Sequence, residues 1–119
     1  MTTAYDRIGG SVAVTRVCRR FYQLVLATEA GRHFVGIEME RLIEHQAQII
    51  GALLGGPGEV SDAFIQSAHR RLNISPSDFA LVAEALVESL SEARLADDDI
   101  KVIADAFVAR ADLVVGSLA

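Results

Sequence analysis

Apolar residues recur at helical spacing along most of this chain, and the alternating pattern of a β-strand is nearly absent. The stretch from Ser11 to about Leu26 is almost continuously apolar. Its apolar side chains fall on two neighbouring lines, Val14, Cys18, Tyr22 and Val25 on one and Val17, Phe21 and Leu24 on the other. A helix that is apolar on most of its sides is a buried helix. The chain is therefore expected to fold as an all-α protein.

The residues that start and stop helices fall between these apolar stretches. A second helix is expected from about Glu38 to Leu54, where Gly55-Gly56-Pro57-Gly58 ends it. A short amphipathic helix over 61–72 follows, capped by Ser61. Ser75-Pro76-Ser77-Asp78 is a strong helix start, and the helix after it carries Phe79, Val82, Leu86 and Leu90 on one face. Asp97 to Asp99 favour the start of the last helix. These signals predict four main helices and short connectors.

The composition limits the class of protein. A chain of 119 residues is the size of one domain, here 1–119, and its single cysteine, Cys18, excludes an intrachain disulfide. Cys18 is expected in the core. A net charge of −5 without a basic stripe argues against nucleic acid as a partner. No apolar run is long enough to span a membrane and no signal peptide is evident, so a cytoplasmic protein is expected.

His69 lies on the apolar face of the short helix, together with Ile65, Ala68 and Leu72. A buried imidazole needs a partner, because an unpaired buried polar group costs a few kcal/mol. A hydrogen bond within the core would satisfy it, and so would a metal bound on its far side. By itself the position of His69 does not decide between the two.

A second polar pattern lies inside the helix over 38–54. Gln46 belongs to an otherwise apolar face, and His45 lies at its edge, about 60° from Leu42 around the helix axis. Tyr22 is another polar-tipped side chain in a buried segment. Either Tyr22 and Gln46 form a hydrogen bond with each other in the core, or they surround a bound group together with His69.

Taken together in chain order, these residues resemble a family. The set comprises Ile8-Gly9-Gly10, Phe21-Tyr22, Val25-Leu26, His33-Phe34, Met39, Leu42, Gln46, Leu53-Leu54-Gly55-Gly56-Pro57 and Ala68-His69. It is similar to the truncated haemoglobins, most closely to group I, the N-type subgroup. The resemblance implies a globin shortened to a two-over-two helical sandwich around haem b.

The resemblance also implies a role for each matching residue. His69 corresponds to the proximal iron ligand, Tyr22 to the tyrosine that hydrogen-bonds the gas, and Gln46 to a distal amide. Leu42 corresponds to the apolar distal wall and Phe34 to the phenylalanine that packs on the porphyrin. The residues expected against the haem are Phe34, Leu42, His45, Ile49, Ile65, Ala68, His69, Arg70, Phe79 and Val82. Arg70 and Arg71 are candidates for the propionates, or are simply a solvated basic pair.

His45 has two interpretations. In some cyanobacterial members of the family a histidine just before the distal glutamine binds iron as a sixth ligand, whereas others carry a lysine there that points to a propionate or to solvent. A modest rotation of the helix decides between them. His33, next to Phe34, is expected on the surface or in a loop.

Three functions follow. The first is a haem protein that binds O₂, NO and CO, with a nitric oxide dioxygenase-type reaction that would need an unidentified reductase. The second is a redox or gas-sensing haem protein whose iron is closed by His45. The third is a cofactor-free helical interaction module. A monomer or a weak homo-oligomer is expected in each case.

Overall fold

The computed structural model describes residues 2–69 and 72–115, and they form helices and connecting loops. Four helices are long: α2 (Gly10–Leu26), α3 (Met39–Leu53), α5 (Pro76–Glu92) and α6 (Asp97–Ala109). The shorter ones are α1 (Ala4–Ile8), the 3₁₀ helix η1 (Glu29–Phe34), α4 (Asp62–His69) and α7 (Ala111–Val114). The predicted all-α class and the four main helices are confirmed.

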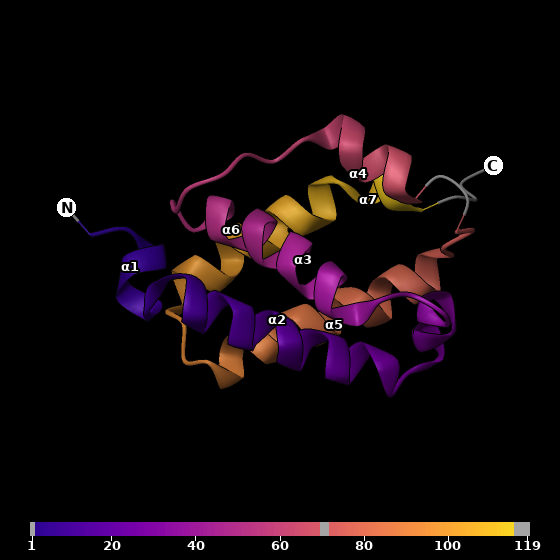
Figure 1. Cartoon of the computed structure of the whole chain (residues 1–119), viewed down its shortest axis with the longest axis horizontal. Coiled ribbons are helices and arrows are strands. Elements are labelled where there is room, and N and C mark those ends of the chain that lie inside the picture. The colour runs from indigo at the N-terminus through magenta and orange to yellow at the C-terminus, as the bar shows by residue number, and fades with distance from the viewer. Residues whose placement is uncertain (1, 70–71, 116–119) are drawn as a thin grey trace.

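The long helices form two antiparallel pairs, α2 with α3 and α5 with α6 (Figure 1). The pairs lie against each other, since α2 packs on α5 and α3 packs on α6. This is the two-over-two arrangement that the resemblance implies. The short α4 lies apart from α2 and α5 and packs mainly on α7 (Figure 1).

Local sequence explains where these helices begin. In α5, the side chain of Ser75 accepts a hydrogen bond from the backbone of Asp78, whose own side chain accepts from the backbone of Ser75. This reciprocal pair is a capping box, and Pro76 follows it in the first turn. The predicted cap of α4 also forms, because the Ser61 hydroxyl accepts from the backbone N–H of Phe64 at 3.2 Å.

The core lies where the helix pairs meet. Its most buried side chains include Val14, Val25, Leu86, Leu90 and Ile103, and Cys18 is buried with them as predicted. Tyr5 of α1 covers one end of this core and donates its backbone N–H to Leu54 O at 3.0 Å. A Cβ on Gly56 would lie only 2.5 Å from the Tyr5 ring, so a glycine at this position permits the contact.

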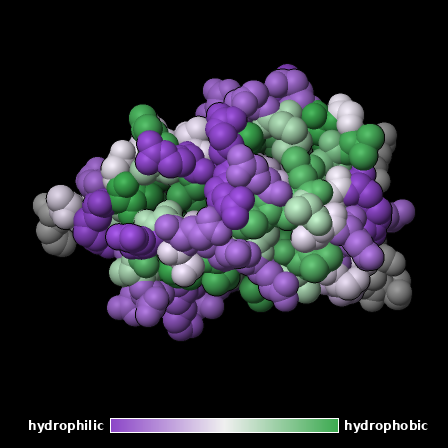
Figure 2. Space-filling view, turned by 90° about the horizontal axis from the view of Figure 1, so that it is seen from below, coloured by the Kyte–Doolittle hydropathy of each residue, from purple (hydrophilic) through white to green (hydrophobic). Residues whose placement is uncertain are grey.

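Surface ion pairs join the helices on the outside. Arg19 of α2 contacts Glu40 of α3 at 2.6 Å, and Arg20 of α2 contacts Glu92 of α5 at 2.9 Å. Seen from below, polar side chains gather across the middle of the molecule, with apolar patches to either side (Figure 2). Within residues 2–69 and 72–115 no helix is long and apolar enough to cross a membrane.

Three short elements were not predicted from the sequence: α1, η1 and α7. Helices of a single turn carry little periodic signal, and they form here because they pack on longer helices. The helix that carries His69 does not reach Leu72 as expected; within the described residues it covers Asp62–His69.

Candidate haem site

A cavity of about 530 Å³ lies between α3 and α4 and extends to α5 and α6. Most of the side chains around it are apolar. Its lining includes every described residue of the predicted site, namely Tyr22, Phe34, Leu42, His45, Gln46, Ile49, Ile65, Ala68, His69, Phe79 and Val82. Arg70, the remaining predicted contact, and Arg71 beside it lie outside the described residues. The fold thus brings together residues from five helical segments that are far apart in the sequence.

His69 is the last described residue of α4, and its ring is oriented by the helix itself. Its Nδ1 lies 2.7 Å from the carbonyl oxygen of Ile65, one turn earlier. A carbonyl only accepts, so Nδ1 carries the proton and donates it. In the neutral ring Nε2 then keeps a free lone pair. A hydrogen bond of this kind fixes the tautomer and the orientation of a histidine that binds a metal.

Tyr22 lies toward the C-terminal end of α2 and is only 5 % exposed. Its ring meets Phe21 and Phe34 edge-on, with centroids 4.7 and 5.7 Å away. Burial first, and the neighbouring Cys18 second, raise the pKa of the Tyr22 hydroxyl well above its usual value. Tyr22 therefore stays neutral and keeps a proton to donate.

Neither the Tyr22 hydroxyl of α2 nor the Gln46 amide of α3 has a hydrogen-bond partner among the described residues. The core hydrogen bond between the two, one of the alternatives from the sequence, is not formed. Every fully enclosed side-chain nitrogen or oxygen in the described part has a partner, so these two polar groups are not fully enclosed, and both residues line the cavity. Two neutral donors thus face the space that His69 also lines.

His45 lies at the opening of the cavity. Its exposed ring stacks on the ring of Phe64, with centroids 5.5 Å apart and planes 22° from parallel, so it joins α3 to α4. Phe64 is 51 % exposed and was not predicted as a site residue. Its position off the apolar face of α4 gave no sign that it would meet a histidine of another helix.

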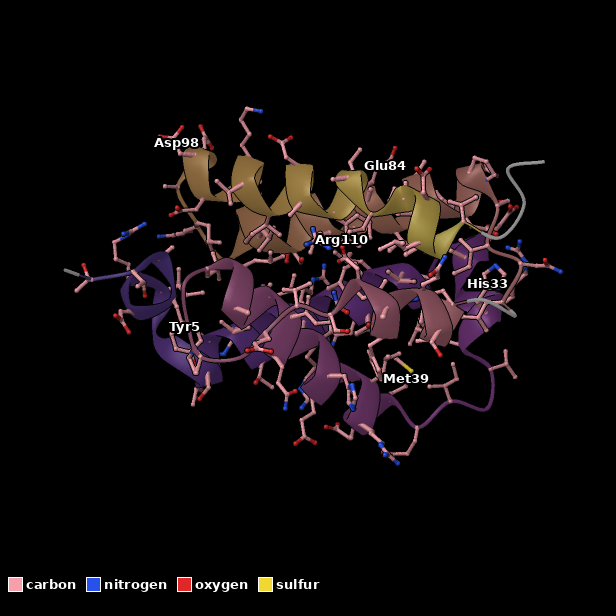
Figure 3. All side chains as sticks on the ribbon, turned by 90° about the horizontal axis from the view of Figure 1, so that it is seen from above. Tyr5, His33, Met39, Glu84, Asp98 and Arg110 are labelled. Atoms are coloured by element: carbon pink, nitrogen blue, oxygen red, sulfur yellow. The ribbon has the colours of Figure 1, made fainter. Side chains whose placement is uncertain are left out.

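The far wall of the cavity comes from α6, from which no site residue was predicted. Phe107 of α6 stacks on Phe79 at 4.9 Å, and Ile103 lies one turn before Phe107. Their helical spacing was the available signal. Arg110, which is labelled in Figure 3, also lines the cavity and contacts Asp62, the first residue of α4, at 2.9 Å.

The prediction for His33 is wrong. Its side chain is only 13 % exposed, and its Nε2 lies 2.8 Å from the buried carboxylate of Asp78. The error arose because Asp78 is 45 residues away, and only the fold brings the first turn of α5 against η1.

These features fit a haem. The cavity has a volume typical of a cofactor site, and its apolar walls suit a flat, largely apolar ring. A single neutral imidazole cannot hold an iron ion alone, but it serves as an axial ligand when a porphyrin supplies the other donors. The two open donors, Tyr22 and Gln46, suit a small polar ligand.

Comparison with known proteins gives the same result. The family model for bacterial-like globins matches residues 3–114. A group 1 truncated haemoglobin of Mycolicibacterium paratuberculosis is 36 % identical over 100 residues, which are 83 % of this chain and 74 % of the relative. One from Tetrahymena thermophila is 30 % identical over 96 residues, 80 % of this chain and 79 % of the relative.

Solved structures agree as well. The truncated haemoglobin of Tetrahymena pyriformis in its Fe(III) form superposes with a TM-score of 0.81 at 26 % identity, covering 98 % of this chain and all of that one. The 2/2 haemoglobin of a Synechococcus species, solved with covalently attached haem, gives 0.79 at 27 % identity with the same coverage. The chain therefore belongs to the bacterial-like globin family, among its group 1 truncated haemoglobins.

Proposed function

We propose that this globin holds haem b in the cavity between α3 and α4 and binds O₂ there. The observation that carries the proposal is the pairing of His69 with the cavity: Nδ1 is bound to Ile65 O at 2.7 Å, and Nε2 is left free. When bound, the haem would supply a ferrous iron that can bind a diatomic gas. His69 is the proposed protein ligand of that iron.

The other residues determine how the gas is held. Tyr22 and Gln46 offer hydrogen-bond donors in a pocket with little competing water, where such donors are most effective. Because burial raises its pKa, Tyr22 donates a proton throughout the physiological range. Leu42, Ile49 and Phe34 line the pocket with apolar surface and limit the access of water. These donors are expected to stabilise bound O₂, which becomes polarised on binding, more than bound CO.

A cation is needed for the haem propionates, and the cavity offers two in the described part. Arg110 already contacts Asp62. Arg41 of α3 lines the cavity and is exposed to solvent. We assign Arg41 as a propionate contact alongside the earlier candidate Arg70, since a guanidinium can bind a carboxylate through two hydrogen bonds.

Detoxification of NO is a finer proposal within the same function. Joining NO to O₂ gives nitrate only when one electron is added. No cysteine is among the described residues that line the cavity, so we assign the delivery of that electron to a separate reductase. NO consumption should therefore stop after one turnover in the absence of an added reductant.

The test is optical spectroscopy of the purified chain after addition of haemin. The wild type should show Soret bands that shift on reduction and again on CO addition. His69→Gly should lose haem or hold it weakly, and free imidazole should restore the spectrum by occupying the vacated space. A His69→Gly protein with full haem retention and an unchanged CO spectrum, without imidazole, would contradict the proposal.

The second candidate is a globin closed by His45, and the observation that favours it is that His45 lines the cavity. His45 lies close enough to the cavity to line it, and the stack on Phe64 is a single contact that can be exchanged for another. Binding to iron requires the neutral imidazole, so acid should weaken it.

The decisive comparison is between His45→Leu and Gln48→Leu, a change on the exposed side of the same helix. A low-spin ferric spectrum at neutral pH that disappears only in His45→Leu supports closure by His45. Identical ferric and ferrous spectra in the wild type and in His45→Leu mean that the side chain points away from the iron.

A further inference from the structure

Asp78 is a buried carboxylate that the proposed site does not use. Only 3 % of the residue is exposed, and it lies in the first turn of α5. Its oxygens accept hydrogen bonds from Arg32 Nη1 at 3.0 Å, Arg32 Nη2 at 2.7 Å, His33 Nε2 at 2.8 Å and the backbone N–H of Ser75 at 3.3 Å. We call Asp78, Arg32 and His33 the Asp78 clamp.

The clamp holds a negative charge. The hydrogen bond from His33, followed by those from Arg32 and Ser75, outweighs the effect of burial and holds the pKa of the Asp78 carboxyl well below its usual range. Capping α5 requires only the Ser75–Asp78 pair. The bonds to Arg32 and His33 reach instead to η1, which is 45 residues earlier in the sequence.

Both ends of the clamp adjoin the cavity wall. Phe34 follows His33, Phe79 follows Asp78, and both phenylalanines line the cavity. Figure 3 shows His33 at the end of the molecule where η1 meets the start of α5. Fixing His33 to Asp78 therefore fixes the position of Phe34 relative to Phe79.

Phe34 transmits this position to Tyr22. The two rings meet edge-on, with centroids 5.7 Å apart. The Tyr22 hydroxyl has no hydrogen bond of its own to the described protein, so packing alone holds the ring, and the edge contacts to Phe34 and Phe21 are part of that packing. A displacement of η1 would thus reach the hydroxyl through a single ring contact.

We propose that the Asp78 clamp positions Phe34, and through it the Tyr22 hydroxyl, and so determines how selectively this globin holds O₂ over CO. The proposal rests on the function proposed above. Asp78, His33 and Arg32 touch neither the haem nor the gas in this scheme. They are positioning residues.

The first test measures gas dissociation from the haem-loaded protein by stopped flow. Asp78→Asn keeps the size and the capping ability of the side chain but loses its charge. It should speed O₂ dissociation roughly three- to ten-fold, which corresponds to losing about half to all of one hydrogen bond. It should speed CO dissociation much less. Glu92→Gln, which breaks the exposed pair with Arg20 at 2.9 Å, is the control and should change neither rate.

His33 provides a second pair of variants if Asp78→Asn is too unstable to study. His33→Leu removes the donor to Asp78 and should speed O₂ dissociation. His33→Gln keeps an N–H at a similar reach and should restore most of the wild-type rate. If the substitutions acted only by destabilising the fold, the O₂ dissociation rate would not depend on whether residue 33 carries that N–H donor.

A double-mutant comparison identifies the route. In a Tyr22→Phe background, Asp78→Asn should have no further effect on O₂ dissociation, because the hydroxyl that it positions is gone. The chain has only two tyrosines, so ¹³C-tyrosine labelling of the reduced, CO-saturated protein gives signals from two rings only. Asp78→Asn should shift the Tyr22 signal and leave that of Tyr5 in place.

These measurements separate the two proposals. A wild type that binds no haem overturns the proposed function. A wild type that binds haem and responds to Tyr22→Phe, but not to Asp78→Asn or His33→Leu, overturns the clamp alone. Equal acceleration of O₂ and CO, or a full Asp78→Asn effect in the Tyr22→Phe background, also overturns it.

Discussion

Tyr22→Phe should weaken O₂ binding without weakening the fold. The change deletes one oxygen atom from a buried ring and leaves the edge contacts to Phe21 and Phe34 in place. In most buried sites such a deletion is destabilising, because a hydrogen bond is lost. Here the hydroxyl has no partner among the described residues, so the folded chain loses none. The free energy of unfolding of the haem-free chain should stay the same or rise by up to about 1 kcal/mol.

The effect on the gas should be large. A hydrogen bond to a partly charged acceptor contributes about 1.5–3 kcal/mol, which corresponds to roughly 10- to 150-fold in a dissociation rate. Gln46 offers a second donor from α3, so the lower end of this range is expected, about ten-fold for O₂. CO carries little charge and should change far less.

The pH dependence has a definite sign. The folded-state pKa of Tyr22 is raised, so its contribution to stability is fully present below the unfolded pKa of about 10 and is lost as the pH rises through the folded value. Tyr22→Phe removes this loss. The variant should therefore gain stability relative to the wild type in strongly alkaline solution.

Stopped-flow dissociation of O₂ and CO, together with urea unfolding of the haem-free chain, tests this reasoning. Tyr5→Phe is the matched control, because Tyr5 is the only other tyrosine and packs on glycines outside the cavity. A loss of more than about 1 kcal/mol of stability in Tyr22→Phe would mean that the hydroxyl has a structural partner. Equal acceleration of both gases would mean that the ring acts by its shape.

Three further outcomes are expected. Gly56→Ala should cost about 1–3 kcal/mol by urea unfolding, because its Cβ would lie 2.5 Å from the Tyr5 ring, and Tyr5→Ala in the same chain should relieve part of that cost. Cys18 should resist iodoacetamide at pH 8 in the native protein and react on unfolding, as mass spectrometry can show, because burial raises its pKa to about 12. Arg110→Gln should speed haem loss to apomyoglobin a few-fold, because it breaks the 2.9 Å contact that ties the residue between α6 and α7 to the start of α4, and Asp62→Asn should match it. An Asp62→Asn protein with unchanged haem loss would contradict that explanation.

Much of the fold was predictable because its signals are local. The cap at Ser75, the stop after Leu54 and the apolar faces of the long helices each depend on residues within a few positions of one another. The positions of His69, Tyr22 and Gln46 on their helices follow from the same periodicity. That they line one cavity was expected only from the resemblance to truncated haemoglobins, since no local pattern states which helix faces meet.

The parts that were missed depend on contacts between distant segments. The sequence shows His33 next to the cavity residue Phe34, but nothing near it predicts the carboxylate that holds it. His45 is similar: helical geometry places it at the edge of the distal face, whereas its actual partner, Phe64, comes from another helix. In both cases a histidine near the haem site is directed by a side chain that the periodicity of its own helix cannot reveal. The roles of His33 and His45 must therefore be decided by substituting their partners as well as the histidines themselves.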